Sequence, residues 1–481
     1  MAKHFNIDFH CHSIMRSTNN AKERNCIDLW AKTLNYRGES VMERWVGIQL
    51  SEMTKESQSN LYAYCSGNTK VIIDSFYPIE KGWLNFRAIS SMLTSSDMKR
   101  NIFRIASGIS ESRFRELIEH TSYFSELEEQ YDVAVSEQGV SFDGKYAYRL
   151  ARSFDDIKNV AESNNKLIVI PSIEGAHALG CGDIDSKGKS AEQMKMLMTE
   201  NIGKIKKWEF PPFFIGLAHH FWNQLCGHAR SFKHPVNFIV DQGSGLNKGI
   251  TALGWHVIRE LLTRKNGRRI LIGIKHMSIK SRVSYYRFIL DNNFLNQDDP
   301  IPIICSHTGV NGFKSMERMT KFSDSRKLSK HTMFNNWSMN LCGEEIQIIH
   351  QTGGIVGVIL DKDVLGSSKY LNTIKNEKEP KIRKTMYLKL IWGTVFFMID
   401  SINEKSGWSV PVFSSDFDGL INQIEFYKSA EDIEQLRCDM LNYLEDNNYK
   451  QELWFGYSPG QLVEKLFCSN IFTFLEKHYR I

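Results

Sequence analysis

The sequence predicts an α/β fold, a (β/α)8 TIM barrel with helical insertions in its early half, on three observations. Short apolar, β-branched runs alternate with longer amphipathic stretches along the chain. There are eight such runs, the number of parallel strands that closes this barrel. Six of the runs end in histidine, aspartate or glutamate, at the strand ends where this fold builds its active site.

The eight predicted strands are recognised by their continuous apolar character, which is typical of parallel strands buried on both faces. They occupy residues 4–10, 69–76, 167–173, 213–218, 269–275, 301–306, 354–360 and 410–415. Patterns typical of helices occupy residues 112–129, 190–206, 253–264, 282–291, 344–351 and 430–444. Because strands and helices alternate, the sequence favours a parallel barrel over a sandwich or a helical bundle.

The connections between the first three runs are much longer than those usual in this fold. We therefore expect inserted helical segments at about residues 20–65 and 85–160, within a single domain that spans residues 1–481. The sequence contains no internal repeat, low-complexity tract or proline-rich linker that would indicate a second domain.

Composition narrows the class of protein. The chain has 481 residues, of which 42% are hydrophobic and 24% charged, enough for a large core. Lysine and arginine number 60 against 55 acidic residues, and this small excess is evenly spread, so no nucleic-acid partner is expected. The nine cysteines form no CxxC pair, which favours free thiols in a reducing compartment.

The start of the chain and its hydropathy give a second expectation about location. Residues 1–9 contain no basic segment followed by an apolar run, and no later stretch approaches the apolar length that spans a bilayer. We therefore expect a cytoplasmic enzyme with no membrane partner.

The polar residues at the strand ends are candidates for a metal site. They are His10, His12, Glu174, His219, His276, His307, Asp416 and Asp418. Each alone has an ordinary structural explanation, such as a hydrogen-bonded histidine, a helix-capping glutamate or a turn-forming aspartate. Their occurrence at six corresponding positions favours a metal centre instead. Imidazole and carboxylate ligands suit zinc, with manganese or iron left open, and Cys11 should point to the opposite strand face.

Several segments resemble the membrane dipeptidase (renal dipeptidase) family of metallopeptidases, a branch of the amidohydrolase superfamily. These segments are residues 8–12 (DFHCH), 171–177 (PSIEGAH), 216–219 (GLAH), 306–308 (SHT), 353–358 (GGIVGV), 415–419 (SDFDG) and 468–470 (CSN). They follow the family's order and extend over nearly the whole chain. The IEG and SDFDG pieces are the most specific.

The resemblance implies a binuclear metal centre. It assigns one zinc to His10 and His12, the other to His276 and His307, and a bridging position to Glu174. A hydroxide that bridges these two divalent ions would attack a small, dipeptide-like amide.

The same resemblance implies the residues that act on the substrate. Asp416 would be the acid/base carboxylate, and His219 would contact the substrate and stabilise the oxyanion. Asn223 and Arg318 are expected as further substrate contacts, together with a homodimeric assembly.

Two departures from the family's pattern bear on the substrate. The family has aspartate where this chain has His12, so the site loses a negative charge. The family also has an arginine after its sixth strand that holds the substrate carboxylate. Spacing from His307 puts this position at Arg318, whereas the following helical pattern puts it near Met339.

Three functions follow from these observations. The first is hydrolysis of a small, dipeptide-like amide by a metal-dependent enzyme. The second is the same chemistry on a lactone, cyclic amide or phosphoester, which the two departures favour. The third is a non-catalytic barrel used as a binding module, indicated by the early insertions and by the aromatic residues Trp208, Phe221 and Trp222.

Overall fold

The computed structural model describes residues 5–20, 27–32, 56–84, 109, 111–119, 121–163, 165–182, 185–232, 240–324 and 333–480. Within them, eight parallel strands follow one another in chain order around a barrel. They are β1 (Asn6–Cys11), β2 (Thr69–Phe76), β5 (Lys166–Ile173), β6 (Phe214–Gly216), β7 (Leu271–Gly273), β8 (Ile304–Thr308), β9 (Ile355–Val358) and β10 (Pro411–Phe413). Each overlaps a predicted run, which confirms the predicted (β/α)8 barrel.

The barrel closes between its first strand and the segment that follows its last. The backbone N–H of Asp416 donates to the His10 carbonyl at 2.9 Å, and that of His12 donates to the Phe417 carbonyl at 3.0 Å. Every residue of β1 and β2 is buried, as expected for strands covered on both faces. The closure places the end of β1 beside the segment that follows β10, at the same rim of the barrel.

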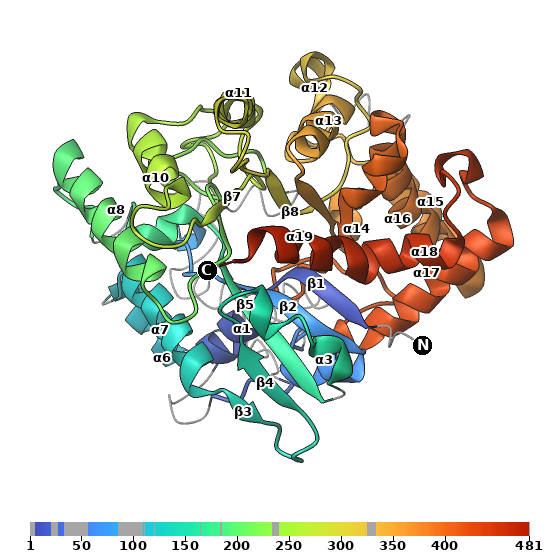
Figure 1. The fold of residues 1–481 in the computed structure, drawn as a ribbon, viewed down its shortest axis with the longest axis horizontal. Coiled ribbons are helices and arrows are strands. Elements are labelled where there is room, and N and C mark those ends of the chain that lie inside the picture. Colours follow the sequence, from blue (N-terminus) through green and yellow to red (C-terminus); the bar gives the residue numbers. More distant parts are fainter. Residues whose placement is uncertain are drawn as a thin grey trace, which may run out of the picture.

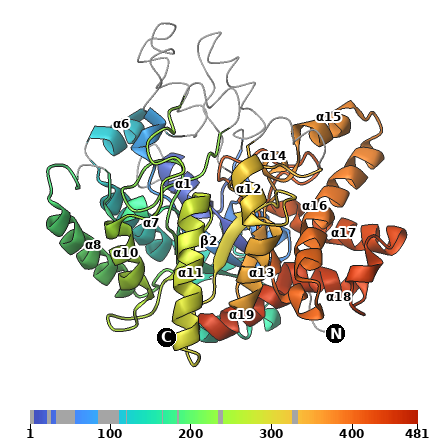
Figure 2. The ribbon, with the colours of Figure 1, turned by 90° about the horizontal axis from the view of Figure 1, so that it is seen from above.

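Helices surround the sheet in chain order (Figure 1). They include α8 (Ala191–Lys206), α10 (Ala252–Leu262), α11 (Ile279–Leu295), α12 (Met316–Phe322), α13 (Gly343–Gln351), α15 (Ser368–Asn376), α17 (Ile433–Asn447), α18 (Pro459–Glu464) and α19 (Asn470–His478). The side chains of Ser190, Thr251 and Ser278 cap α8, α10 and α11 by accepting backbone N–H groups of the first turn. Both chain ends and α19 lie at one end of the barrel, opposite α6 (Glu111–Glu119) (Figure 2).

The early insertions are helical only in part. Most of the insertion expected at residues 20–65 lies outside the described residues. The described part consists of the end of α1 (Ser13–Asn20), residues 27–32 and 56–60, and most of α3 (Leu61–Ser66). The second insertion contains α6 and α7 (Tyr123–Ser136), which divide the predicted helix 112–129 in two. It also contains a hairpin of β3 (Gly139–Val140) and β4 (Ala147–Leu150), and β4 pairs in parallel with β5.

Two features of this hairpin, its turn and the alternating burial of β4, are typical of a β-structure and not of the expected helix. Asp143 and Gly144 form its turn, with Gly144 at a φ of 69°, a conformation that glycine adopts readily. Tyr148 and Leu150 are buried while Arg149 between them is exposed, an alternation typical of a strand. The insertion expected at about 85–160 therefore contains this hairpin besides its helices.

Helix α16 (Pro380–Ile402) corrects the expectation that no stretch is long and apolar enough to span a membrane. By length and composition this helix meets that criterion, but 61% of its most apolar window is buried inside the fold. Trp392, fully buried, donates from its indole nitrogen to the Met440 carbonyl of α17 at 3.1 Å. The apolar surface of α16 is thus used largely in packing.

A buried ion pair joins α11 to α13. The Arg282 guanidinium donates to Glu345 at 2.7 Å and to the Met277 carbonyl at 2.8 Å, and Tyr286 donates to the same carboxylate at 2.9 Å. Both charged side chains are at most 1% exposed, so neither charge is hydrated and each is stabilised by the other.

We expect Glu345→Ala to destabilise the protein by about 3–5 kcal/mol, because it leaves a guanidinium buried without its counter-charge. Urea denaturation followed by circular dichroism would measure the change. The double variant Arg282→Met/Glu345→Leu, which removes both charges, should recover most of the loss. Equal destabilisation by the single and double variants would show that packing, not charge, dominates here.

Candidate metal centre

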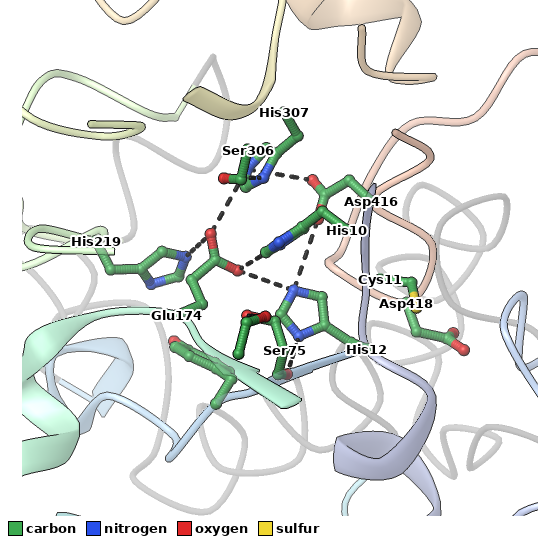
Figure 3. Close-up of polar contacts among 12 residues, drawn as sticks. His10, Cys11, His12, Ser75, Glu174, His219, Ser306, His307, Asp416 and Asp418 are labelled. Atoms are coloured by element: carbon green, nitrogen blue, oxygen red, sulfur yellow. Dashed lines mark hydrogen bonds and ion pairs between the residues drawn. The ribbon is translucent and has the colours of Figure 1, made fainter. Parts of the chain in front are cut away.

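Six of the predicted site residues converge at the C-terminal rim of the barrel. Figure 3 labels five of them, all except His276. They come from β1, β8 and the segments directly after β1, β5, β7 and β10: His10, His12, Glu174, His276, His307 and Asp416. All six side chains are buried. Because parallel strands end at one rim, residues far apart in the sequence meet here.

Glu174 lies at the centre of the cluster. Its Oε2 atom is 2.8 Å from Nε2 of His12 and 3.3 Å from Nε2 of His10. Its Oε1 atom is 3.3 Å from Nε2 of His276 and 3.5 Å from Nε2 of His307. Each carboxylate oxygen therefore faces a different histidine pair, which is the arrangement that a bridging ligand of two ions requires.

Asp416 lies across the histidines from Glu174. Its Oδ1 atom is 3.6 Å from Nε2 of both His10 and His12, and its Oδ2 atom is 3.8 Å from Nε2 of His307. Burial raises the pKa of Asp416, against the lowering effect of its hydrogen bond with His12. Burial also acts to raise the pKa of Glu174, but His10 and other nearby histidines hold it well below its usual value. The two carboxylates thus differ in their affinity for a proton.

The backbone at this rim is held in uncommon conformations. His276 and Asp416 have φ values of 64° and 59°, in the left-handed region that non-glycine residues seldom adopt. Gly175, directly after Glu174, has a φ of 84°, and a Cβ atom there would collide with the His177 ring. A Cβ atom on Gly419 would collide with the Asp416 carboxylate. Gly175 is therefore required by its backbone conformation and by the His177 ring, and Gly419 by the Asp416 carboxylate.

Three histidines at the rim are oriented by bonds from their outer ring nitrogen. Nδ1 of His12 lies 2.9 Å from the Ser75 carbonyl, and Nδ1 of His307 lies 3.1 Å from Oγ of Ser306. Nδ1 of His219 lies 2.6 Å from Oε2 of Glu80. In each case Nε2 is left to face Glu174, the orientation found for metal-bound histidines.

Glu80 was not among the predicted site residues. It is 2% exposed and accepts hydrogen bonds from the Tyr77 hydroxyl at 3.1 Å and the Phe221 backbone N–H at 3.0 Å, besides its bond to His219. Although burial acts to raise its pKa, His219 and His177 lower it to about 2. Its position made Glu80 a candidate, because it follows the second strand closely and so lies at the same rim as the predicted ligands.

His219 itself lies on the loop after β6, with Nε2 at 3.7 Å from Oε1 of Glu174. Burial acts to lower its pKa, but Glu80 and Glu174 raise it above its usual value. A histidine held in this way keeps a proton that it can donate to an oxyanion.

The remaining predicted residues lie apart from the cluster. Asp418 accepts hydrogen bonds from Arg16 at 2.6 Å and from the backbone N–H of Ser59 at 3.0 Å, so it joins α1 to the segment before α3. The Cys11 thiol lies 3.6 Å from Oδ1 of Asp74, on the face away from the cluster, as expected (Figure 3).

The two other predicted substrate contacts differ in their setting. Asn223 is buried and bonds to the Leu217 carbonyl at 2.7 Å and to the Leu225 backbone N–H at 3.0 Å, which orders the loop after β6. Arg318 is exposed on α12, and Met339, its alternative, is buried. As substrate contacts, Asn223 and Arg318 stay predictions.

A cavity opens beside the cluster. Polar groups of the rim and apolar side chains line it together. Its lining consists of His12, Met15, Arg16, Asn19, Tyr77, Ile79, Trp83, Ile109, Glu174, His219, His220, Asp418, Gly419 and Leu420. A small molecule in this cavity would reach both Glu174 and His219.

A buried glutamate of α7 forms a hydrogen bond with one of the residues that line this cavity. Oε1 of Glu126 accepts the backbone N–H of Ile79 at 2.9 Å, and burial raises the pKa of Glu126 from 4.5 to about 8. The folded state therefore holds a proton on this carboxyl between these two pH values while the unfolded state does not. Stability from this group is lost as pH rises through that window.

We expect Glu126→Gln, which keeps the acceptor oxygen, to make stability less dependent on pH between about 5 and 8. Urea midpoints of both proteins at pH 5, 6.5 and 8 would measure this. The wild type should lose more stability across the range than the variant. Parallel losses in the two proteins would show that Glu126 titrates at its ordinary value.

Comparison with known proteins places the fold but not the family. No family model and no curated protein sequence matches the chain. Among solved structures, the chain is similar to dipeptidase AC, a metallopeptidase of family M19, with 13% identity over 99% of both chains and a TM-score of 0.53. It is also similar to a metallopeptidase from Rhodobacter sphaeroides bound to a phosphinate mimic of the dipeptide L-Ala-D-Ala, with 14% identity over 99% of both chains and a TM-score of 0.52. These similarities confirm the fold that the sequence resemblance implied.

Proposed function

We propose that the protein is a metal-dependent hydrolase with two divalent ions, related to the membrane dipeptidase family. The observation that carries this proposal is the position of Glu174, whose two oxygens face two separate histidine pairs. Two chains that are similar in fold are, by name, a dipeptidase and a metallopeptidase, which agrees with the proposal.

The residues at the rim fit a pair of divalent ions. The donor atoms of His10, His12, Glu174 and Asp416, and those of Glu174, His276 and His307, lie within 4.8 Å of one another in each group. Both ring nitrogens of His276 are buried without a hydrogen-bond partner among the described residues. A nitrogen-rich set that lacks thiolates suits zinc best.

When bound, the two ions would acidify a water molecule between them and polarise the scissile carbonyl. Asp416 would accept the proton of that water and pass it to the leaving amine, a role that its raised pKa supports. Nε2 of His219, held by Glu80 through Nδ1, would donate to the oxyanion.

We propose a small, dipeptide-like amide as the substrate. The cavity offers apolar side chains for a substrate side chain, including Ile79, Trp83 and Leu420, next to the rim histidines. A lactone, cyclic amide or phosphoester is the second candidate, because Arg318, expected to hold a carboxylate, is exposed on α12 and does not line the cavity.

A substrate panel tests the proposal. Zinc-supplemented protein would be assayed with dipeptides that carry a free or an amidated carboxyl end, and with lactones and phosphoesters. We expect cleavage of dipeptides, with a preference for apolar side chains. Cleavage of esters alone would favour the second candidate, and inertness towards all of these compounds in a protein that binds no metal would favour a binding module.

A further inference from the structure

Three histidines form a second cluster beside Glu174. His219 and His220 lie on the loop after β6, and His276 follows β7. The centroids of their rings are 3.8 Å apart for His219 and His220, 4.5 Å for His219 and His276, and 5.0 Å for His220 and His276. One nitrogen from each ring lies within 4.8 Å of the others. Three imidazoles at this separation can converge on one ion.

Several nitrogens of this cluster lack the hydrogen bonds that buried polar atoms normally make. Nδ1 of His220 and both ring nitrogens of His276 are buried and have no partner among the described residues. Such groups are costly unless something binds them. A neutral imidazole has one ring nitrogen with a free lone pair, which a metal ion can accept.

The third ring, His219, is oriented like a metal ligand. Glu80 accepts the Nδ1 proton of His219 at 2.6 Å and also holds the loop through the backbone N–H groups of His220, at 3.3 Å, and Phe221, at 3.0 Å. A carboxylate on the outer nitrogen fixes the ring and makes the inner nitrogen more basic. The Glu80 carboxylate thus orients the His219 ring and also positions the backbone of His220.

We propose that His219, His220 and His276 form an alternative position for the second ion, which shares His276 with the position built from Glu174 and His307. This inference rests on the proposed function. A neutral imidazole has a single lone pair, so His276 serves one position at a time. Three imidazoles without a carboxylate select zinc, cobalt or nickel over magnesium or calcium.

The alternative position has a functional consequence. An ion there uses Nε2 of His219, the atom that the proposed function assigns to the oxyanion, and it removes His276 from the bridged pair. The protein with its second ion at the three histidines is therefore an inactive form. The position is a means of regulation by metal, separate from the catalytic arrangement.

The test uses variants that affect one position without the other. His307→Ala removes a ligand from the bridged position only, and His307→Ala/His220→Ala also removes one from the alternative position. Binding of Zn²⁺ and Co²⁺ would be measured by equilibrium dialysis with elemental analysis, and the visible spectrum of the cobalt forms would be recorded. The matched control is His307→Ala/His256→Ala, because His256 bonds to Thr199 on the outer helices.

We expect two ions per chain in the wild type, in His307→Ala and in the control, but one in His307→Ala/His220→Ala. The cobalt spectrum of His307→Ala should also change when His220 is removed. One ion in His307→Ala, or two regardless of His220, would overturn the inference. A wild type that binds no ion would instead refute the proposed function. Should His307→Ala not fold, His307→Asn in both backgrounds gives the same comparison.

Discussion

Glu174→Gln should lose at least about 10³-fold in kcat/KM and should not retain two ions. The substitution keeps the shape of the side chain but leaves only one oxygen acceptor, so it cannot bridge the two histidine pairs that Glu174 contacts at 2.8 to 3.5 Å. Bound ions contribute several kcal/mol to the transition state, which corresponds to a loss of this size. Steady-state kinetics and elemental analysis of the same preparation would measure both effects.

The matched control for this prediction is Glu137→Gln, an exposed glutamate at the end of α7. It should keep the activity and the metal content of the wild type. If Glu174→Gln retained two ions and full turnover, the carboxylate bridge would not be part of the mechanism.

Asp416→Asn should separate proton transfer from metal binding. Asparagine tolerates the left-handed conformation at this position, where φ is 59°, so the fold and the histidine cluster should persist. Loss of a general acid/base lowers the rate by about 10²–10⁴-fold. We therefore expect kcat to fall by this factor while the protein still binds two ions.

The pH profile of kcat would distinguish this role from a structural one. The limb assigned to Asp416 should be absent in the variant, whereas a simple loss of folded protein would lower the profile uniformly. Asp446→Asn, at an exposed position of α17, provides the comparison. A wild-type rate in Asp416→Asn would require a different proton acceptor.

The barrel could be predicted from the sequence because its strands are buried on both faces. β2 was predicted with its observed bounds, Thr69–Phe76, and every residue of this strand is buried. Strands β6, β7 and β10 are shorter than the predicted runs. At β7 the reason is visible, because the chain leaves the ladder after Gly273 and turns at His276, whose φ is 64°. A backbone turn of this kind is not encoded in apolar periodicity.

The residues of the candidate site were predictable to the extent that they follow strands directly. His10, Glu174 and His307 lie on a strand or one residue beyond it. Glu80 lies further from its strand, on a loop whose path depends on the hydrogen bonds it makes to the neighbouring loop, so strand position alone did not indicate it. His220 directly follows His219 after β6, but the family resemblance implied a role for His219 alone.

The structure of the insertions could not be predicted from the sequence in the same way. The β3–β4 hairpin adds a strand beside β5 although it follows two helices in the chain, and only long-range pairing makes it part of the sheet. Such pairing depends on the partner strand and not on the local sequence.

Anomalous diffraction from crystals grown with zinc, without chelator, would locate the bound ions. We expect two zinc peaks per chain at the barrel rim, one bound by His10 and His12 and the other by His276, with a Glu174 oxygen near each when the bridged position is filled. A single peak away from these histidines, or none at full zinc occupancy of the solution, would contradict this expectation.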